Sequence, residues 1–318
     1  MPKRGAVQPL EFPAPTVQPG HRIGPVTCYN PTSRRYIQID TVLMPKYDNG
    51  RRPQHAYYTL PSKKPVPTTL GHVEFCRVLL KRNFSATTSD NDSASSNTTP
   101  VFEWTNQCVA VKVSYLDRVG QYPEEDPFKE IAALQLLGDR PVHVVGAIDA
   151  LSDDHHLFLV MRYCHSGDFF QLLQGCSSNN RAGGGSFGLS EHEARYWFLQ
   201  LVKGVQFLHS KGLCHRDLSP ENIMIDWDEV LIIDMGMCLR VQDVTGADAV
   251  NQDESRRRPC RIQPLHPVGK LPYMSPEVYE CREVDGYAAD VWMCGTILFC
   301  MLTGKLIRCP GMALTFGS

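Results

Sequence analysis

The stretch Cys214-His215-Arg216-Asp217-Leu218-Ser219-Pro220-Glu221-Asn222 decides how the rest of the sequence is interpreted. It carries an Asp and an Asn five positions apart, Asp217 and Asn222, on what the flanking residues predict to be a short loop. A carboxylate and a carboxamide this close together on one loop make the pair a candidate for catalysis or ligand binding. A solvated loop between a helix and a strand is the alternative interpretation of the same residues.

Regular elements are predicted on both sides of this loop. Upstream, Ser190-Glu191-His192-Glu193 is a capping-box pattern that opens an amphipathic helix reaching residue 208. Downstream, the short apolar runs 223–226 and 230–233 predict a pair of strands. The second run leads directly into Asp234-Met235-Gly236. The loop is therefore expected to connect a long helix to a β-hairpin.

A lysine lies inside an apolar run farther upstream. Val109-Ala110-Val111-Lys112-Val113 predicts a buried strand, in which a charged side chain is costly unless it is paired. The helix predicted from Pro127 to Leu137 offers Glu130 as the partner of Lys112, with Glu125 as a weaker alternative. The other interpretation of Glu130 is an ordinary solvated charge on that helix.

Two further motifs follow the loop, Gly269 to Glu277 and Asp290 to Gly295. In this order, over roughly residues 70 to 305, the motifs together resemble those of eukaryotic protein kinases of the Ser/Thr type. The resemblance implies an α+β, two-lobed protein kinase-like fold, with a β-rich N-lobe that holds one key helix and a mainly helical C-lobe. It also implies a protein serine/threonine kinase that uses ATP and Mg²⁺ to phosphorylate a Ser or Thr hydroxyl of a protein substrate.

The resemblance assigns roles to individual residues. Asp217 is expected to orient the substrate hydroxyl and accept its proton, while Asn222 and Asp234 hold Mg²⁺. Lys112, paired with Glu130, is expected to position the phosphates. Asp290 corresponds to the residue that ties down the catalytic loop, here Cys214–Asn222, through backbone hydrogen bonds. The further nucleotide-binding residues that the resemblance implies are Gly71, Val78, Ala110, Met161, Arg162, Cys164, Asp168 and Met224.

The segment Gly71 to Val78 has the spacing of a kinase glycine-rich loop, with only its first glycine present. Val73 and Cys76 stand at the places of the other two glycines, and Phe75 stands at the tip. Glycines in that loop let backbone N–H groups approach the phosphates without a Cβ in the way. The sequence therefore predicts a looser phosphate cover, with lower nucleotide affinity and rate.

A second departure from the kinase pattern involves two positions together. Ser219 stands where most Ser/Thr kinases carry a Lys, and Lys270 stands where they carry a Thr. These two family positions touch, so we expect Lys270 to supply the phosphate-facing charge and Ser219 the hydroxyl. Coincidence is the alternative interpretation.

Composition shifts predict the domain organisation. Residues 1–64 are rich in Pro and are expected to form a largely disordered extension. Residues 65–161 are expected to form the N-lobe, with a low-complexity insertion at 85–100. Residues 162–318 are expected to form a C-lobe that is incomplete at its C-terminus, truncated after its large central helix.

The 318-residue chain has a formal net charge of −2, which gives no electrostatic reason to expect nucleic acid or a membrane as a partner. Its 12 Cys have no metal-ligand spacing and favour a reducing compartment, the cytoplasm or alternatively the nucleus. Asp168 and Glu221 favour protein substrates with basic residues near the target site. The rival functions are a pseudokinase that binds nucleotide or serves as a scaffold, and an inactive truncated fragment.

Overall fold

The computed structural model describes residues 10–46, 54–82, 101–122, 125–179, 188–241, 261–264 and 266–305. The predicted insertion at 85–100 lies outside the described residues. The chain divides into two compact units. One consists of Thr16–Tyr122 and Ala147–Tyr163, and the other of Met1–Pro15, Pro123–Gly146 and Cys164–Ser318. We call them the strand unit and the helical unit.

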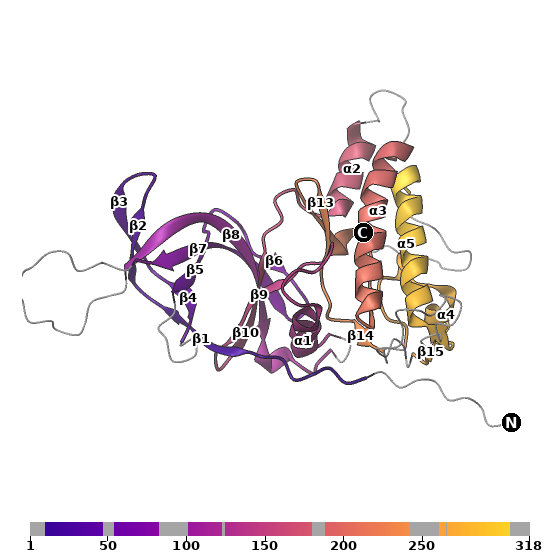
Figure 1. Ribbon diagram of the computed structural model, residues 1–318, viewed down its shortest axis with the longest axis horizontal. Coiled ribbons are helices and arrows are strands. Elements are labelled where there is room, and N and C mark those ends of the chain that lie inside the picture. The colour runs from indigo at the N-terminus through magenta and orange to yellow at the C-terminus, as the bar shows by residue number, and fades with distance from the viewer. Residues whose placement is uncertain are drawn as a thin grey trace, which may run out of the picture. The chain divides into compact units, whose positions relative to one another are not determined.

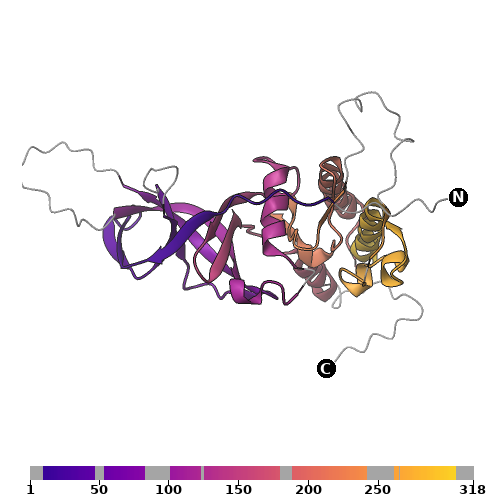
Figure 2. The same cartoon turned by 90° about the horizontal axis from the view of Figure 1, so that it is seen from below.

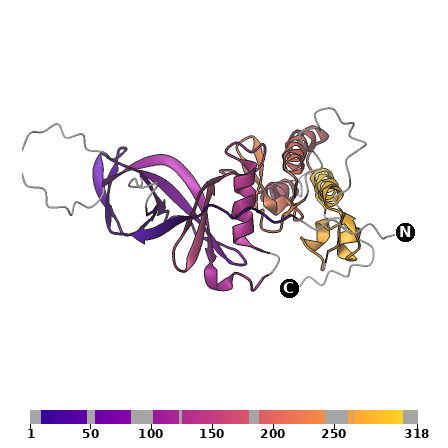
Figure 3. The ribbon, with the colours of Figure 1, turned by 60° about the horizontal axis from the view of Figure 1, so that its bottom comes forward.

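The strand unit is a sheet that closes on itself (Figures 1 and 3). Its strands follow the order β3-β2-β8-β10-β9-β1-β4-β5-β7-β6, and an additional pairing of β7 with β8 closes a barrel of β8, β10, β9, β1, β4, β5 and β7. The strands are β1 (Gln18–Ile23), β2 (Val26–Asn30), β3 (Arg35–Ile39), β4 (Val42–Pro45), β5 (His55–Thr59), β6 (Val66–Pro67), β7 (Gly71–Lys81), β8 (Val101–Tyr115), β9 (Ala147–Ser152) and β10 (His156–Arg162).

Alternation along the strands fills the barrel. Val109, Val111 and Val113 of β8 are buried, and they share a core with Phe158 of β10 and Leu151 of β9. Because successive side chains of a strand point to opposite faces, Ala110 and Lys112 lie on the other face of β8. The predicted strand at 109–113 is confirmed as part of the longer β8.

The prediction of a largely disordered segment at 1–64 is wrong for its described part. Five strands, β1 to β5, lie between Gln18 and Thr59. Val26, Val42 and Ala56 of these strands are buried in a second core with Leu79 and Phe102. The prolines misled the prediction, because they fall mostly before β1 or at strand ends, where a missing N–H costs little.

The helical unit contains the helices α1 (Pro127–Leu137), α2 (Phe169–Asn179), α3 (Glu191–Ser210), α4 (Pro276–Tyr279) and α5 (Gly286–Thr303). Its strands are β11 (Leu213–Cys214), β12 (Ile223–Asp226), β13 (Glu229–Ile232), β14 (Leu239–Arg240), β15 (Arg261–Ile262) and β16 (Val284–Asp285). The long helices α3 and α5 pack side by side (Figures 1 and 2).

The helices α3 and α1 begin at the capping residues that the sequence predicts. The Ser190 side chain accepts a hydrogen bond from the Glu193 backbone N–H, and the Glu193 carboxylate accepts one from the Ser190 N–H at 2.9 Å, which confirms the capping box. The Asp126 carboxylate caps α1 by accepting hydrogen bonds from the backbone N–H groups of Phe128 and Lys129, with Pro127 in the first turn. Such caps each stabilise a helix by about 1 kcal/mol.

Within the described residues, α5 alone has the length and apolar composition that a membrane-spanning helix needs. Half of it is buried inside the protein, and a core helix meets the same criteria. It is therefore weak evidence for a membrane segment.

Candidate active site

A buried carboxylate of α5 holds the start of the catalytic loop. Asp290 is 0% exposed, and its two oxygens accept hydrogen bonds from the backbone N–H groups of His215 and Arg216, each at 2.8 Å. The His209 ring bonds the same carboxylate at 2.9 Å. Hydrogen bonds from several donors satisfy a charge that would be costly to bury alone. The predicted anchoring of the loop by Asp290 is confirmed.

His215 connects the loop to the strand that leads to Asp234. Its Nδ1 accepts a hydrogen bond from the Asp217 backbone N–H at 3.2 Å, and its Nε2 lies 3.0 Å from the Ile233 carbonyl oxygen. A carbonyl only accepts, so Nε2 carries the proton and Nδ1 is the acceptor. Sequence reasoning assigned no role to this ring, although its place before Arg216 and Asp217 was a usable signal.

Asp217, Asn222 and Lys270 form one hydrogen-bonded group. The Asn222 side-chain N–H₂ donates to the Asp217 carbonyl and to its carboxylate Oδ2, both at 2.8 Å. The Lys270 backbone N–H donates to Asp217 Oδ1 at 2.9 Å. Both carboxylate oxygens of Asp217 are therefore fixed in direction, and the side chains of Asp217 and Asn222 are buried.

The contact that the sequence predicts between Ser219 and Lys270 is present. Lys270 Nζ donates to Ser219 Oγ at 2.7 Å and to Asn222 Oδ1 at 3.2 Å. It also lies 3.7 Å from a carboxylate oxygen of Glu221. Ser219 is fully buried, so this hydroxyl is held in place by its surroundings. The ammonium group is thus fixed next to the Asp217–Asn222 pair.

A close backbone approach brings Lys270 to this position. The preceding residue, Gly269, has a φ of +97°, and a Cβ there would lie 2.5 Å from the Arg216 carbonyl oxygen. Only glycine fits both conditions without strain.

Burial raises the pKa of the Asp217 carboxyl above its ordinary value of 3.8, and the negative charge of Asp234 adds to this effect. The Lys270 ammonium group opposes it. The two carboxylates of Asp217 and Asp234 therefore lie close enough to repel each other.

Two residues of the site have a left-handed backbone. Arg216 has a φ of +70° and Asp234 a φ of +66°. Non-glycine residues in this region are uncommon, and they concentrate at functional sites where the surrounding contacts enforce the geometry.

The glycine-rich loop predicted at Gly71–Val78 is wrong. The whole segment belongs to β7, and it pairs along its length with β8, from Gly71 opposite Ser114 to Cys76 opposite Val109. Val78 is buried in the barrel core, so its side chain faces away from Lys112. Gly71 is required for a different reason, because a Cβ there would lie 2.0 Å from the Val113 carbonyl oxygen.

The strand register shows which residues share a face with Lys112. Val73 lies opposite Lys112, and Phe75 lies opposite Ala110. Met161 lies opposite Ala110 on the other side. Alternation places these side chains on the outer face of the barrel wall. Sequence reasoning missed Val73 and Phe75 as members of this face, because it assigned them to a loop.

Lys63 contacts two aromatic side chains at one end of the barrel face that carries Lys112. Its ammonium group lies 4.5 Å from the centre of the Tyr163 ring and 5.5 Å from that of Phe75, and it donates a hydrogen bond to the Tyr163 hydroxyl. The Phe75 and Tyr163 rings meet edge to face at 5.6 Å. Cation–π contacts of this kind are each worth about 0.5–2 kcal/mol.

The remaining predicted residues lie along the segment that leaves β10. Met161 and Arg162 end that strand, and Cys164 is buried just beyond it. Asp168 caps α2 by accepting a hydrogen bond from the Gln171 N–H at 2.8 Å. It also forms a β-bridge with Met224, which brings these two predicted residues together. Their contact with a nucleotide stays a prediction.

Lys112 and Glu130 belong to different units. Lys112 is half-buried on β8, and Glu130 is buried on α1. Their predicted ion pair stays a prediction.

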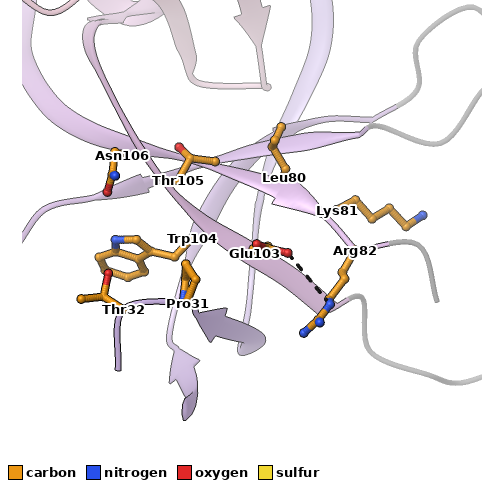
Figure 4. Close-up of a pocket in the computed structure, with 9 residues that line it drawn as sticks. All are labelled: Pro31, Thr32, Leu80, Lys81, Arg82, Glu103, Trp104, Thr105 and Asn106. Atoms are coloured by element: carbon orange, nitrogen blue, oxygen red, sulfur yellow. Dashed lines mark ion pairs between the residues drawn. The ribbon is translucent and has the colours of Figure 1, made fainter. Parts of the chain in front are cut away.

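A separate cavity of about 540 Å³ contains none of the predicted site residues (Figure 4). Trp104, Glu103 and Arg82 line it, with an ion pair of 3.9 Å between Arg82 and Glu103. It lies against the strands β7 and β8 of the strand unit.

Among the described residues, no group of three or more His, Cys, Asp or Glu side chains could hold a metal ion. Mg²⁺ bound beside a nucleotide needs only one or two carboxylates, since phosphates and waters supply the other ligands.

A buried Asp held beside an Asn and a Lys, on a loop anchored by a second buried Asp, is the arrangement of an enzyme that transfers phosphoryl groups. A family model described as protein kinase domain matches residues 94–311. The chain belongs to the protein kinase family.

Curated relatives agree with this assignment. The chain is 34% identical over 202 residues to CBL-interacting protein kinase 25 of Oryza sativa subsp. japonica, covering 63% of this chain and 35% of that protein. It is 33% identical over 204 residues to CBL-interacting serine/threonine-protein kinase 15 of Arabidopsis thaliana, covering 64% and 42%. It is 34% identical over 197 residues to serine/threonine-protein kinase SAPK9 of Oryza sativa subsp. japonica, covering 61% and 46%. The chain spans about a third to a half of the length of these relatives.

Proposed function

We propose that this chain is the catalytic part of a protein serine/threonine kinase that transfers the γ-phosphoryl group of ATP to a Ser or Thr hydroxyl of a protein. The observation that carries the proposal is the placement of Lys270 Nζ, 2.7 Å from Ser219 Oγ and 3.2 Å from Asn222 Oδ1, beside the Asp217 carboxylate. It joins a base, an oxygen ligand and a cation in one group, and these are the parts that phosphoryl transfer requires.

The residues present fit Mg²⁺ and the phosphates of ATP. Asn222 uses its N–H₂ on Asp217, and its side-chain oxygen, which accepts one hydrogen bond from Lys270, keeps a second lone pair for a metal ion. The charge of Asp234 raises the pKa of Asp217, and a cation between them would relieve that repulsion. Asn222 and Asp234 would hold the metal ion, which supplies charge neutralisation at the phosphates.

The residues of the candidate active site would then have the following tasks. Asp217 orients the attacking hydroxyl and takes its proton, with its carboxylate fixed by Asn222 and by the backbone of Lys270. Lys270 stabilises the negative charge on the transferred group, an electrostatic effect that is strongest in a site from which water is excluded. Lys112 would position the phosphates, with Glu130 as its partner.

The finer assignments follow from the same proposal. The strand unit with α1 would form the N-lobe, and the remainder of the helical unit the C-lobe. Substrates would carry basic residues that meet Asp168 and Glu221. We place the protein in the cytoplasm, with the nucleus as the alternative.

A phosphate-transfer assay tests the function. The 318-residue chain, given Mg·ATP labelled on the γ-phosphate, should phosphorylate Ser or Thr of basic histone more than of acidic casein. Asp217→Asn should lower the rate by about 10³-fold or more while nucleotide binding stays within a few fold, because the substitution removes the base and leaves the cation sites. Equal rates for Asp217→Asn and the natural chain would refute the assignment.

One observation favours the pseudokinase alternative. The segment expected to cover the phosphates, Gly71–Val78, is a paired strand instead of a glycine-rich loop. Binding of Mg·ATP by calorimetry, without transfer to any protein substrate, would support a nucleotide-binding or scaffolding role.

A further inference from the structure

The N-terminal segment pairs with a strand that follows the Asp234 motif. The Leu10 backbone N–H donates to the Arg240 carbonyl at 2.8 Å, and the two residues form an antiparallel β-bridge. The Arg240 guanidinium group donates to the Glu11 carbonyl at 3.0 Å. Both residues belong to the helical unit, although they lie more than 200 positions apart in the sequence.

The strand that receives this contact pairs with the strand that leads into the catalytic loop. Arg240 is in β14, which pairs with β11 through Leu213–Arg240 and Cys214–Leu239. The strand β11 ends at Cys214, one residue before His215 of the catalytic loop. The Val241 N–H also donates to the Gly212 carbonyl at 2.8 Å. Leu10 therefore adds a third backbone segment at the free side of a two-stranded sheet.

A second link connects this sheet to the catalytic loop. The Arg216 side chain donates to the Met237 carbonyl at 3.4 Å, and the Cys238 N–H donates to the Met235 carbonyl at 3.1 Å. The turn after Asp234 is thus held between the catalytic loop and β14. A shift of β14 would be transmitted to Asp234 and Arg216 through these bonds.

We propose that the backbone of Leu10 and Glu11 positions β14, and through it the Asp234 and Asp217 carboxylates, for phosphoryl transfer. The inference rests on the proposed kinase activity. Strand addition supplies affinity through main-chain hydrogen bonds, while side chains provide specificity. Leu10 and Glu11 are positioning residues, because neither touches the reacting atoms.

Two substitutions test the proposal in the full chain. Leu10→Pro removes the N–H that Arg240 accepts, and Arg240→Ala removes the donor to the Glu11 carbonyl. Each should lower kcat by roughly three- to tenfold, the change that corresponds to one net hydrogen bond, while KM for ATP and for the protein substrate stays within about twofold. Ala14→Pro is the matched control, because it adds the same ring to an exposed residue outside the contact.

Two further measurements separate positioning from folding. Arg240→Lys keeps a donor for the Glu11 carbonyl, so it should restore most of the kcat that Arg240→Ala loses. Hydrogen exchange of the Val241 amide should be faster in Leu10→Pro than in Ala14→Pro, with an unchanged melting temperature.

The outcomes distinguish a failure of the positioning role from a failure of the proposed kinase function. Unchanged kcat and unchanged exchange at Val241 in both Leu10→Pro and Arg240→Ala would overturn the inference. If Leu10→Pro does not fold, Arg240→Ala and its Lys rescue decide it: an Ala variant with natural kcat refutes the positioning role. If the natural chain transfers no phosphate while exchange at Val241 still responds, the proposed function fails and only the positioning of β14 survives.

Discussion

The cation of the candidate active site is supplied from an unexpected position in the sequence. Lys270 and Ser219 meet through an Nζ–Oγ hydrogen bond of 2.7 Å, at positions where the family pattern has the two residue types reversed. What matters for charge stabilisation is where the ammonium group lies in space. An exchange between touching positions preserves both the charge and the hydrogen bond.

We expect Lys270→Met to lower kcat by about 10²–10³-fold with a small change in KM, since it removes a charge that acts on the transition state. Ser219→Ala should cost about tenfold or less, because it removes one neutral partner. Steady-state kinetics with Mg·ATP measure both effects.

The reversed pair provides the control. Lys270→Thr combined with Ser219→Lys should recover activity relative to Lys270→Thr alone, as coupled neighbours do in a double-mutant cycle. Full activity of Lys270→Met would show that the exchange of residue types between positions 219 and 270 plays no part in catalysis.

The acidic limb of the pH–rate profile should reflect protonation of the Asp217 carboxylate. Burial and the charge of Asp234 raise the pKa of this carboxyl, and a base must be unprotonated to act, so activity should disappear on acidification at a pH above the ordinary aspartate pKa of 3.8. Lys270 opposes the shift, so in Lys270→Met the limb should move to still higher pH. A limb that stays in place in kcat/KM profiles of this variant would exclude Asp217 as the titrating group.

Much of this group of residues was predictable from sequence. Asp217, Asn222 and Lys270 come from motifs whose order fixes which loops meet, and their contacts follow. The role of His215 could not be read, because it depends on which ring nitrogen faces the Ile233 carbonyl. That geometry exists only once the loop and the strand are folded together.

At the scale of elements, helices were easier to predict than the strand β7. Caps such as Ser190 with Glu193 and Asp126 with Pro127 are local signals, so α3 and α1 begin where the sequence indicates. The glycine of Gly71–Val78 was ambiguous, because a loop needs glycine for backbone freedom and a tightly paired strand needs it for space. Only the register of β7 against β8 decides between the two.

Gly71→Val distinguishes these two roles. A Cβ at this position would lie 2.0 Å from the Val113 carbonyl oxygen, so the substitution should destabilise the strand unit by about 1–3 kcal/mol. Thermal unfolding measures the loss. Gly175→Ala in α2 is the control, since nothing lies within 4 Å of the added methyl, and it should be neutral or stabilising. Weaker nucleotide binding with unchanged stability in Gly71→Val would favour the loop instead.

At the scale of the whole molecule, the N-terminal strands are part of the folded protein. The strand β1 lies between β4 and β9, and Arg22 of β1 binds both oxygens of Glu74 on β7, at 2.9 and 3.0 Å. The sequence concealed this, because the strands are short and their partners lie far along the chain. Composition alone therefore described the segment as disordered.

The Arg22–Glu74 pair should make the strand unit sensitive to acid. Burial alone would raise the pKa of Glu74, but Arg22 and the hydrogen bonds from His72 and Thr59 outweigh it and hold the pKa below its ordinary value of 4.5. A lowered pKa gives stability that is present above pH 4.5 and is lost as the pH falls through the folded-state value. Glu74→Gln should cost about 1–3 kcal/mol at neutral pH, and the difference from the natural chain should shrink on acidification.

Denaturant unfolding at several pH values measures this difference. In the double variant Arg22→Met with Glu74→Gln, the two losses should be less than additive. A pH-independent cost of Glu74→Gln would mean that the carboxylate charge contributes nothing.

The parallel pairing of β1 with β9 also bears on how the protein acquires its structure. Gln18 and Pro19 are made well before Leu151 and Ser152, so the pairing of β1 with β9 has to wait for the later strand. Contacts between residues this distant in sequence slow folding, because a large loop must close before any energy is gained. A nascent chain would therefore carry one unpaired edge of β1 until residue 151 has been made, even though the other edge can already pair with β4. This open edge is a natural site for a chaperone to protect.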